Sequence, residues 1–201
     1  MCLQNGKEPE RENMPIKIFI DQGHNPVNPN AGAEGNGYRE QDLVYEIGKS
    51  LEALLNANPN FEARTSRNDP DEILGTNTAT SLAARTNAAN SWGADYFISI
   101  HANASDLPDA SGSEAFVYSA SSPAYALAEN ILVGLSEATG LQNRGIFSRP
   151  TLYVLRKTAM PALLLEVGFI TNSGDAQLMA ENPDLIARGI YNGILRYFGL
   201  S

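Results

Sequence analysis

Residues 16–24 read I-K-I-F-I-D-Q-G-H, a short apolar run that stops at a polar turn. Isoleucine and phenylalanine in close succession are typical of a β-strand, and the glycine before the histidine indicates that the strand ends in a turn. Residues 96–101, Y-F-I-S-I-H, repeat this arrangement with the second of the chain's two histidines. A nearly continuous apolar run is typical of a strand covered on both faces. The two stretches therefore predict an α/β fold in which each histidine follows a buried strand.

The rest of the chain alternates helical and strand-like patterns. Apolar residues recur at helical spacing from Glu40 until Asn58-Pro59, and residues 25–37 before this helix read as a loop rich in Gly, Asn and Pro. We predict strands at 16–20, 61–65, 96–100, 114–118, 151–155 and 163–167, and further helices at 80–92, 124–139 and 184–198. Such alternation predicts one α/β domain over residues 16–201, a three-layer sandwich with helices flanking a mostly parallel or mixed sheet of about six strands.

Composition excludes several classes of function. The chain has 201 residues and a formal charge of −9, so we expect no nucleic-acid partner, because an acidic surface repels a phosphate backbone. Its apolar stretches, such as residues 162–165, are far shorter than the roughly 20 residues that span a bilayer, so we expect no transmembrane segment. The single cysteine excludes an internal disulfide and a thiolate metal cluster.

Residues 1–15 are polar and are interpreted as a flexible N-terminal segment without a visible secretory signal. Cys2 leaves two interpretations open. It is an exposed thiol of no consequence, or it is the lipid-accepting cysteine that remains after a lipoprotein signal is removed. In the second case the residues after it form a solvated tether.

Four side chains suited to metal-assisted hydrolysis lie at or beside strand ends, where open α/β sheets bind their ligands. His24 and His101 follow the first and third predicted strands, Glu166 lies in the last strand, and Glu40 begins the first helix. Two imidazoles and one carboxylate leave a fourth position open for water, which is the arrangement of hydrolytic zinc sites. Glu166 is the candidate for moving the proton.

Each of these residues also has a purely structural interpretation. A histidine at a strand end is often only a hydrogen-bonded loop residue. The negative charge of Glu40 is favoured at a helix N-terminus whether or not it binds a metal. Glu166 lies inside an apolar run, where a carboxylate is costly to bury unless it is paired or used. Its structural alternative is an ion pair with an arginine.

Four motifs resemble those of the zinc-dependent N-acetylmuramoyl-L-alanine amidases, the Amidase_3 family of peptidoglycan hydrolases. Residues 20–24 (IDQGH) resemble the family's Ile-Asp-Pro-Gly-His, and residues 35–43 (GNGYREQDL) its Gly-x-x-Glu-x-Asp-Leu segment. Residues 99–104 (SIHANA) match its Ser-Ile-His-Ala-Asn-Ala. Residues 160–172 (MPALLLEVGFITN) resemble its closing Pro-Ala-x-Leu-x-Glu-x-Gly-Phe-x-x-Asn. The motifs come in family order and span nearly the whole chain.

The resemblance implies zinc as cofactor, His24, Glu40 and His101 as its ligands, and Glu166 as the catalytic carboxylate. The implied reaction is hydrolysis of the amide that joins N-acetylmuramic acid to L-alanine in peptidoglycan. It places the protein outside the cytoplasm, in the cell envelope. We expect a monomer, located by a partner protein or by a lipid on Cys2.

Further residues match the family pattern less specifically. Arg67 is expected to steady the site from behind the ligands, and Asn103 to contact substrate. Residues 143–145 (NRG) match without an assignable role, and Arg85, on a predicted helix, is interpreted as structural.

Two alternative functions stay open. A zinc carboxypeptidase shares this kind of sheet, but places its first histidine and glutamate three residues apart, whereas His24 and Glu40 are 16 apart. The other alternative is a non-catalytic wall-binding module, against which the complete set of four side chains argues.

Overall fold

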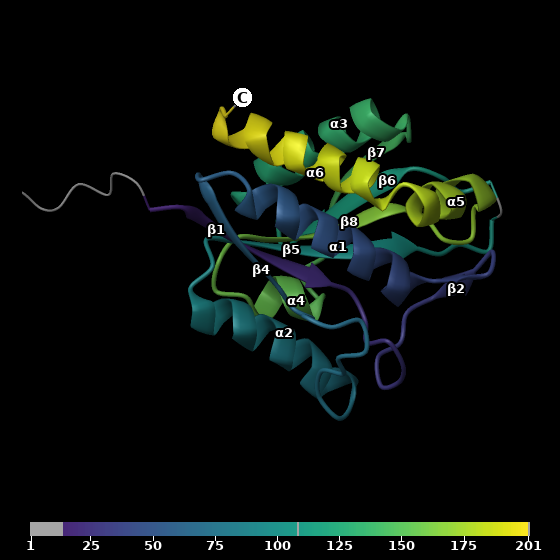
Figure 1. Cartoon of the computed structure of the whole chain (residues 1–201), viewed down its shortest axis with the longest axis horizontal. Helices are drawn as coiled ribbons and strands as arrows, with labels where there is room; N and C mark the ends of the chain where they lie inside the picture. Colours follow the sequence, from purple (N-terminus) through teal and green to yellow (C-terminus); the bar gives the residue numbers. More distant parts are fainter. Residues whose placement is uncertain (1–13, 108, 201) are drawn as a thin grey trace, which may run out of the picture.

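The computed structural model describes residues 14–107 and 109–200, which form a six-stranded sheet between two layers of helices (Figure 1). The order of the strands across the sheet is β4-β1-β5-β8-β6-β7, and every neighbouring pair is parallel except the antiparallel pair β8 and β6. This confirms the predicted three-layer α/β sandwich with a mostly parallel sheet. The strands of this sheet are β1 (Ile16–Gln22), β4 (Phe61–Thr65), β5 (Tyr96–Asn103), β6 (Ser113–Val117), β7 (Asn143–Ser148) and β8 (Ala162–Phe169).

The helices divide between the two faces of the sheet. They are α1 (Glu40–Asn56), α2 (Thr78–Trp92), α3 (Ala124–Thr139), α4 (Tyr153–Lys157), α5 (Ser173–Glu181) and α6 (Pro183–Phe198). Helices α1, α3 and α6 lie on one face, and α2 and α4 on the other (Figure 1). Successive side chains of β1 point to opposite faces of the sheet. Ile18 and Ile20 belong to the larger apolar core, whereas Phe19 belongs to the smaller core beneath α2 and α4. Both faces of the central strands are therefore covered.

The predicted strand at 151–155 is wrong. This segment forms the short helix α4, which packs against α2 and β8. Its run of apolar residues resembles a strand, but the neighbouring residues Val154 and Leu155 are both buried in the smaller core, as a helix face allows. Tertiary packing therefore overrides the local pattern.

Four further elements were not predicted. Strand β7 is an edge strand with no alternating burial. Helix α5 is preceded by its N-cap Asn172, whose side chain accepts hydrogen bonds from two backbone N–H groups. The predicted loop 25–37 runs into a small hairpin of β2 (Glu34–Gly35) and β3 (Tyr38–Arg39). Asn36 and Gly37 turn this hairpin with φ angles of 52° and 83°, as an Asn-Gly turn requires.

Residues 1–13 of the predicted N-terminal segment, Cys2 among them, lie outside the described residues. Across the described residues, every helix is too short or too polar to cross a lipid bilayer.

Helices α3 and α6 approach each other closely because glycines line their contact. A methyl group added at Gly193 on α6 would lie 2.4 Å from the Cα atom of Ile131 on α3, and one added at Gly134 would lie 2.4 Å from the carbonyl oxygen of Gly189. The obstacles are backbone atoms, which cannot rotate away. The packing of this layer therefore depends on the absence of side chains at these positions.

We predict that Gly193→Ala destabilises the protein by about 1–3 kcal/mol, because the added methyl group overpacks the α3–α6 contact. The same change in an unobstructed helix would stabilise it. Chemical denaturation measures the difference. Asn192→Ala, at the exposed neighbouring position, serves as the control and should change the stability by less than about 0.5 kcal/mol. A stabilised Gly193→Ala variant would contradict the close contact.

Candidate metal centre

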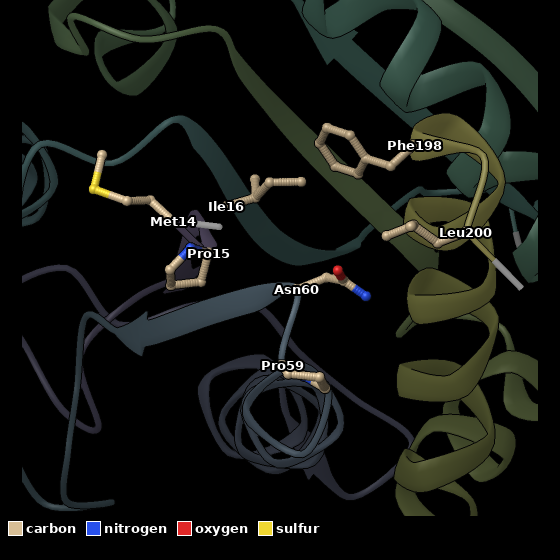
Figure 2. A pocket seen from close by; sticks show the side chains of 7 residues that line it. All are labelled: Met14, Pro15, Ile16, Pro59, Asn60, Phe198 and Leu200. Atoms are coloured by element: carbon tan, nitrogen blue, oxygen red, sulfur yellow. The ribbon is translucent and has the colours of Figure 1, made fainter. Parts of the chain in front are cut away.

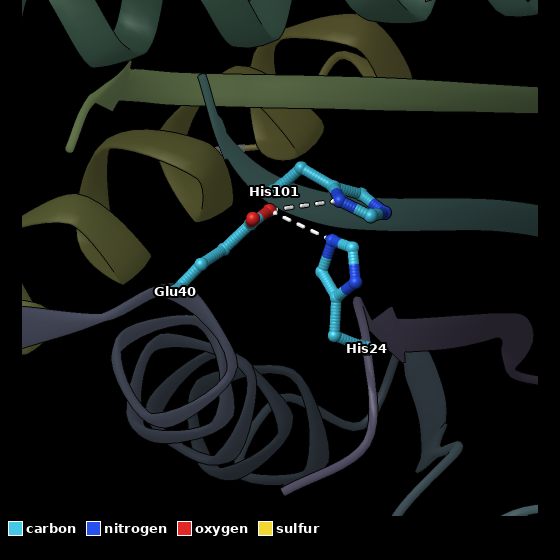
Figure 3. Close-up of side chains that lie close together, drawn as sticks. All are labelled: His24, Glu40 and His101. Atoms are coloured by element: carbon cyan, nitrogen blue, oxygen red, sulfur yellow. Dashed lines mark hydrogen bonds and ion pairs between the residues drawn. The ribbon is translucent and has the colours of Figure 1, made fainter. Parts of the chain in front are cut away.

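Three predicted ligands, His24, Glu40 and His101, converge at the carboxyl ends of the central strands (Figure 3). His24 follows β1, Glu40 is the first residue of α1, and His101 lies near the end of β5. One ligand atom of each lies within 4.8 Å of the others. Oε1 of Glu40 is 3.1 Å from Nε2 of His24 and 3.0 Å from Nδ1 of His101. Residues far apart in the chain thus form one cluster of two nitrogen donors and one oxygen donor.

The carboxylate of Glu40 is held by the backbone as well as by the imidazoles. Its Oε1 accepts a hydrogen bond from the N–H of Ala102 at 3.0 Å, and its Oε2 from the N–H of Ala33 at 2.9 Å. Burial raises the pKa of Glu40, but its hydrogen bonds with His101 and His24 lower it well below the ordinary value. The group is therefore ionised at neutral pH and fixed in position, as a metal ligand must be.

Gly23, between the end of β1 and His24, leaves room for the ring of His101 on β5. A methyl group at Gly23 would lie 2.5 Å from Cε1 of His101, so only glycine leaves room for this ring. The backbone at His24 has a φ of 67°, which turns the chain sharply out of β1. The two imidazole rings meet edge to face, with 4.8 Å between their centroids.

A buried ion pair anchors this turn. Arg85 on α2 donates to Oδ1 of Asp21 at 2.7 Å and to the backbone carbonyl of His24. Oδ2 of Asp21 accepts from the hydroxyl of Ser99 on β5 at 2.7 Å. Burial by itself would raise the pKa of Asp21, but the Arg85 guanidinium and Ser99 hold it below its ordinary value. Arg85, interpreted from the sequence as structural, therefore holds the backbone that carries a ligand.

Glu166 lies on β8, where its backbone is in register with His101 on one side and with Glu114 of β6 on the other. Its Oε2 atom is buried and has no hydrogen-bond partner among the described residues, and it forms no ion pair with them. The predicted alternative of an ion pair with an arginine is therefore wrong for this part of the chain. Burial, followed by the charges of Glu40 and Glu114, raises the pKa of Glu166 to about 8.

Within the described part of the chain, the two more weakly predicted residues make no hydrogen bond with the side chains of the predicted ligands. Arg67 is fully buried, and its guanidinium donates to the carbonyl of Gln41 at 2.7 Å, one residue beyond Glu40 on α1. Burial lowers the pKa of Arg67 to about 10, so it keeps its charge at neutral pH. Asn103 donates to Oε1 of Glu114 at 2.9 Å. A role for Arg67 in steadying the site and for Asn103 in contacting substrate stay predictions.

A hollow of about 150 Å³ adjoins the two histidines. Leu82, Leu152 and Leu164 contribute apolar side chains to its lining. A larger hollow lies at the beginning of β1, at the opposite end of that strand from His24 (Figure 2). It is lined by Met14, Pro15, Ile16, Pro59, Asn60, Phe198 and Leu200, which include no titratable side chain. The smaller hollow is the one of these two that adjoins the cluster of predicted ligands.

The fold and the cluster together define an α/β protein with a three-residue site of the kind that binds a catalytic divalent metal. Residues 18–196 match the family model described as N-acetylmuramoyl-L-alanine amidase. The amidase CwlM of Bacillus licheniformis is 38% identical over 190 residues, which cover 92% of this chain and 70% of that protein.

Solved structures give the same result. The catalytic domain of the amidase CwlV from Bacillus (Paenibacillus) polymyxa var. colistinus superposes with a TM-score of 0.79 at 30% identity, covering 92% of this chain and 99% of that one. An N-acetylmuramoyl-L-alanine amidase from Clostridium difficile 630 gives a TM-score of 0.82 at 30% identity, with 92% and 97% covered. The chain belongs to the N-acetylmuramoyl-L-alanine amidase family, and it hydrolyses the amide between N-acetylmuramic acid and L-alanine in peptidoglycan.

We predict that Asp21→Asn lowers the free energy of unfolding by about 3–5 kcal/mol, because it leaves Arg85 as a buried charge without its partner. Chemical denaturation measures this loss. Glu137→Gln removes one half of the exposed Arg196–Glu137 pair and should cost less than about 1 kcal/mol. Equal losses of unfolding free energy in both variants would contradict the larger contribution expected of the buried Asp21–Arg85 pair.

Proposed function

We propose that His24, Glu40 and His101 hold a catalytic zinc ion and that Glu166 moves the protons in the amidase reaction. The observation that carries this proposal is the convergence of the three donor atoms, with the buried Oε2 of Glu166, which lacks a partner among the described residues, on the strand in register with His101. A carboxylate buried without a partner is costly, so its retention points to a catalytic use.

The donor set fits zinc. Two imidazole nitrogens and one carboxylate oxygen are the protein ligands of many hydrolytic zinc sites, which keep a further position for water or substrate. Within residues 14–107 and 109–200, this is also the single group of three or more His, Cys, Asp or Glu side chains close enough to share an ion. When bound, zinc supplies a Lewis acid that polarises the scissile carbonyl and makes water more acidic.

Glu166 performs both proton transfers in this proposal. Its carboxylate takes a proton from the attacking water, whose oxygen bonds to the lactyl carbonyl carbon. The same carboxyl group then gives the proton to the alanine nitrogen as the carbon–nitrogen bond breaks. The products are a lactyl carboxylate on the sugar and a peptide with a free amine. A raised pKa suits a group that must both accept and release a proton near neutral pH.

We also propose that the protein acts outside the cytoplasmic membrane, because its polymeric substrate lies there. The net charge of −9 opposes tight intrinsic binding to an anionic wall. Its location would then depend on a partner protein or on a lipid attached to Cys2, and the catalytic unit would be a monomer.

We predict that His24→Ala and His101→Ala abolish zinc retention together with activity, because each removes one of three ligands. Elemental analysis after dialysis measures the zinc content. Zinc should also raise the melting temperature of the unchanged protein and not that of the two variants, since an ion stabilises only a fold that binds it. Asn192→Ala should retain zinc. Stoichiometric zinc in both histidine variants would contradict the ligand assignment.

We predict that Glu166→Gln keeps the zinc and the melting temperature but lowers turnover by about 10²–10⁴-fold, the usual contribution of general acid–base catalysis. The amide is nearly isosteric with the carboxyl group and cannot carry the proton. Release of peptide from purified peptidoglycan measures turnover, and Glu129→Gln, on the exposed side of α3, is the control. Loss of zinc in Glu166→Gln would show that Glu166 is a ligand instead.

A further inference from the structure

The motif Asn143-Arg144-Gly145 forms a bulge on strand β7 that aims Arg144 toward the catalytic face of the sheet. Ser113 of β6 is in register with Asn143, but Ala115 is in register with Ile146, so β7 has one extra residue opposite Glu114. Bulges of this kind redirect a side chain and are frequent beside active sites. Gly145 has a φ of 99°, a conformation that favours glycine. The bulge and the backbone conformation of Gly145 therefore determine the position of Arg144.

Arg144 is held firmly on three sides. Its Nε donates to Oε2 of Glu114 at 2.9 Å, and its Nη1 donates to the carbonyl of Ser111 at 3.2 Å. Its guanidinium also lies over the ring of Phe169, with 5.0 Å to the ring centroid. The side chain nevertheless stays 36% exposed, and its Nη2 makes no hydrogen bond within the described part of the chain. A fixed cation thus keeps a free donor toward solvent.

The positions of the site residues across the sheet fix where this cation lies. The strand order β5-β8-β6-β7 places His101, Glu166, Glu114 and Arg144 on four successive strands. Neighbouring strands are about 4.8 Å apart, so Arg144 starts about 10 Å beyond Glu166, on the side away from the metal ligands. Its long side chain returns toward Glu114 and shortens this distance.

The proposed role of Glu166 determines which part of the substrate extends in this direction. A carboxyl group that protonates the leaving amine must lie on the amine side of the scissile bond, so the stem peptide leaves the metal centre past Glu166. An extended peptide advances about 3.3–3.6 Å per residue. The residue after L-alanine therefore comes within reach of Arg144. In peptidoglycan that residue is a glutamate joined through its side chain, whose α-carboxyl group is free in some walls and amidated in others.

We propose that Arg144 is a specificity residue that binds this free α-carboxylate, so that the enzyme prefers stem peptides with an unamidated second residue. The inference rests on the proposed role of Glu166. Arginine suits the task, because its planar guanidinium offers several donors to a carboxylate. Glu114 orients the guanidinium through Nε and leaves Nη2 for the ligand.

The test uses two synthetic N-acetylmuramoyl tripeptides, both amidated at the C-terminus, which differ only in a free or amidated α-carboxyl group at the second residue. The zinc-loaded enzyme should cleave the free acid with a kcat/KM at least about tenfold higher, since a charge-assisted hydrogen bond of ordinary strength accounts for that factor. Arg144→Gln should bring the ratio of the two kcat/KM values close to one. Arg144→Lys should retain part of the preference.

The ratio distinguishes recognition from a structural role. Arg144→Gln also deprives Glu114 of its counter-ion, but a structural defect lowers the rates for both substrates together and leaves their ratio unchanged. Arg196→Gln, which removes an arginine from an exposed ion pair on α6, is the control and should keep the preference. An unchanged enzyme without preference, or an Arg144→Gln variant that keeps it, would overturn the inference. Failure of the unchanged enzyme to cleave either tripeptide would contradict the proposed function itself.

Discussion

The buried pair of Asp21 and Arg85 is the constraint on which the rest of the site depends. It joins three elements at one point, because Arg85 comes from α2, Asp21 from β1, and the second oxygen of Asp21 binds Ser99 of β5. Arg85 also binds the carbonyl of His24, so the same guanidinium fixes the turn that presents the first imidazole. Breaking the pair would leave an unpaired charge in the interior, which is far more costly than losing a surface ion pair. Ligand position and fold stability are therefore coupled.

Beyond this ion pair, the order of the strands in the sheet determines which site residues are neighbours. Because β5, β8, β6 and β7 lie side by side, their residues form a row that runs from the proposed metal ligand His101 through Glu166 to Arg144. Strand β6 runs antiparallel to β8, yet its register still places Glu114 opposite Glu166. The bulge in β7 then redirects the side chain of Arg144. A peptide that lies across the strands would thus meet the proposed metal centre, the proposed proton carrier Glu166 and the cation of Arg144 in turn.

Sequence patterns predicted the central sheet and the cluster of site residues, but not the ion pair that holds the cluster in place. His24, His101 and Glu166 could be found because each interrupts or ends an apolar run, and a polar group there needs a reason. The strand predicted at 151–155 failed because apolar spacing in so short a segment does not distinguish a strand from a helix. Strand β7 was missed because an exposed edge strand has no alternation. The Asp21–Arg85 pair joins residues 64 positions apart, a contact that no local pattern encodes.

The burial of Glu166 shows why the catalytic group and the specificity group have opposite surroundings. Arg144 donates a hydrogen bond to one oxygen of Glu114, and Asn103 donates to the other oxygen, so these three side chains hold each other in position. Glu166, one strand away, has a buried oxygen without such a partner among the described residues. An arginine paired with Glu166 would favour the ionised form and weaken it as a base. The charge of Glu114 contributes to the raised pKa of Glu166. The proposed proton transfer thus uses a carboxyl group that is unpaired among the described residues, and the proposed recognition uses an arginine held by an ion pair, on β8 and β7 respectively.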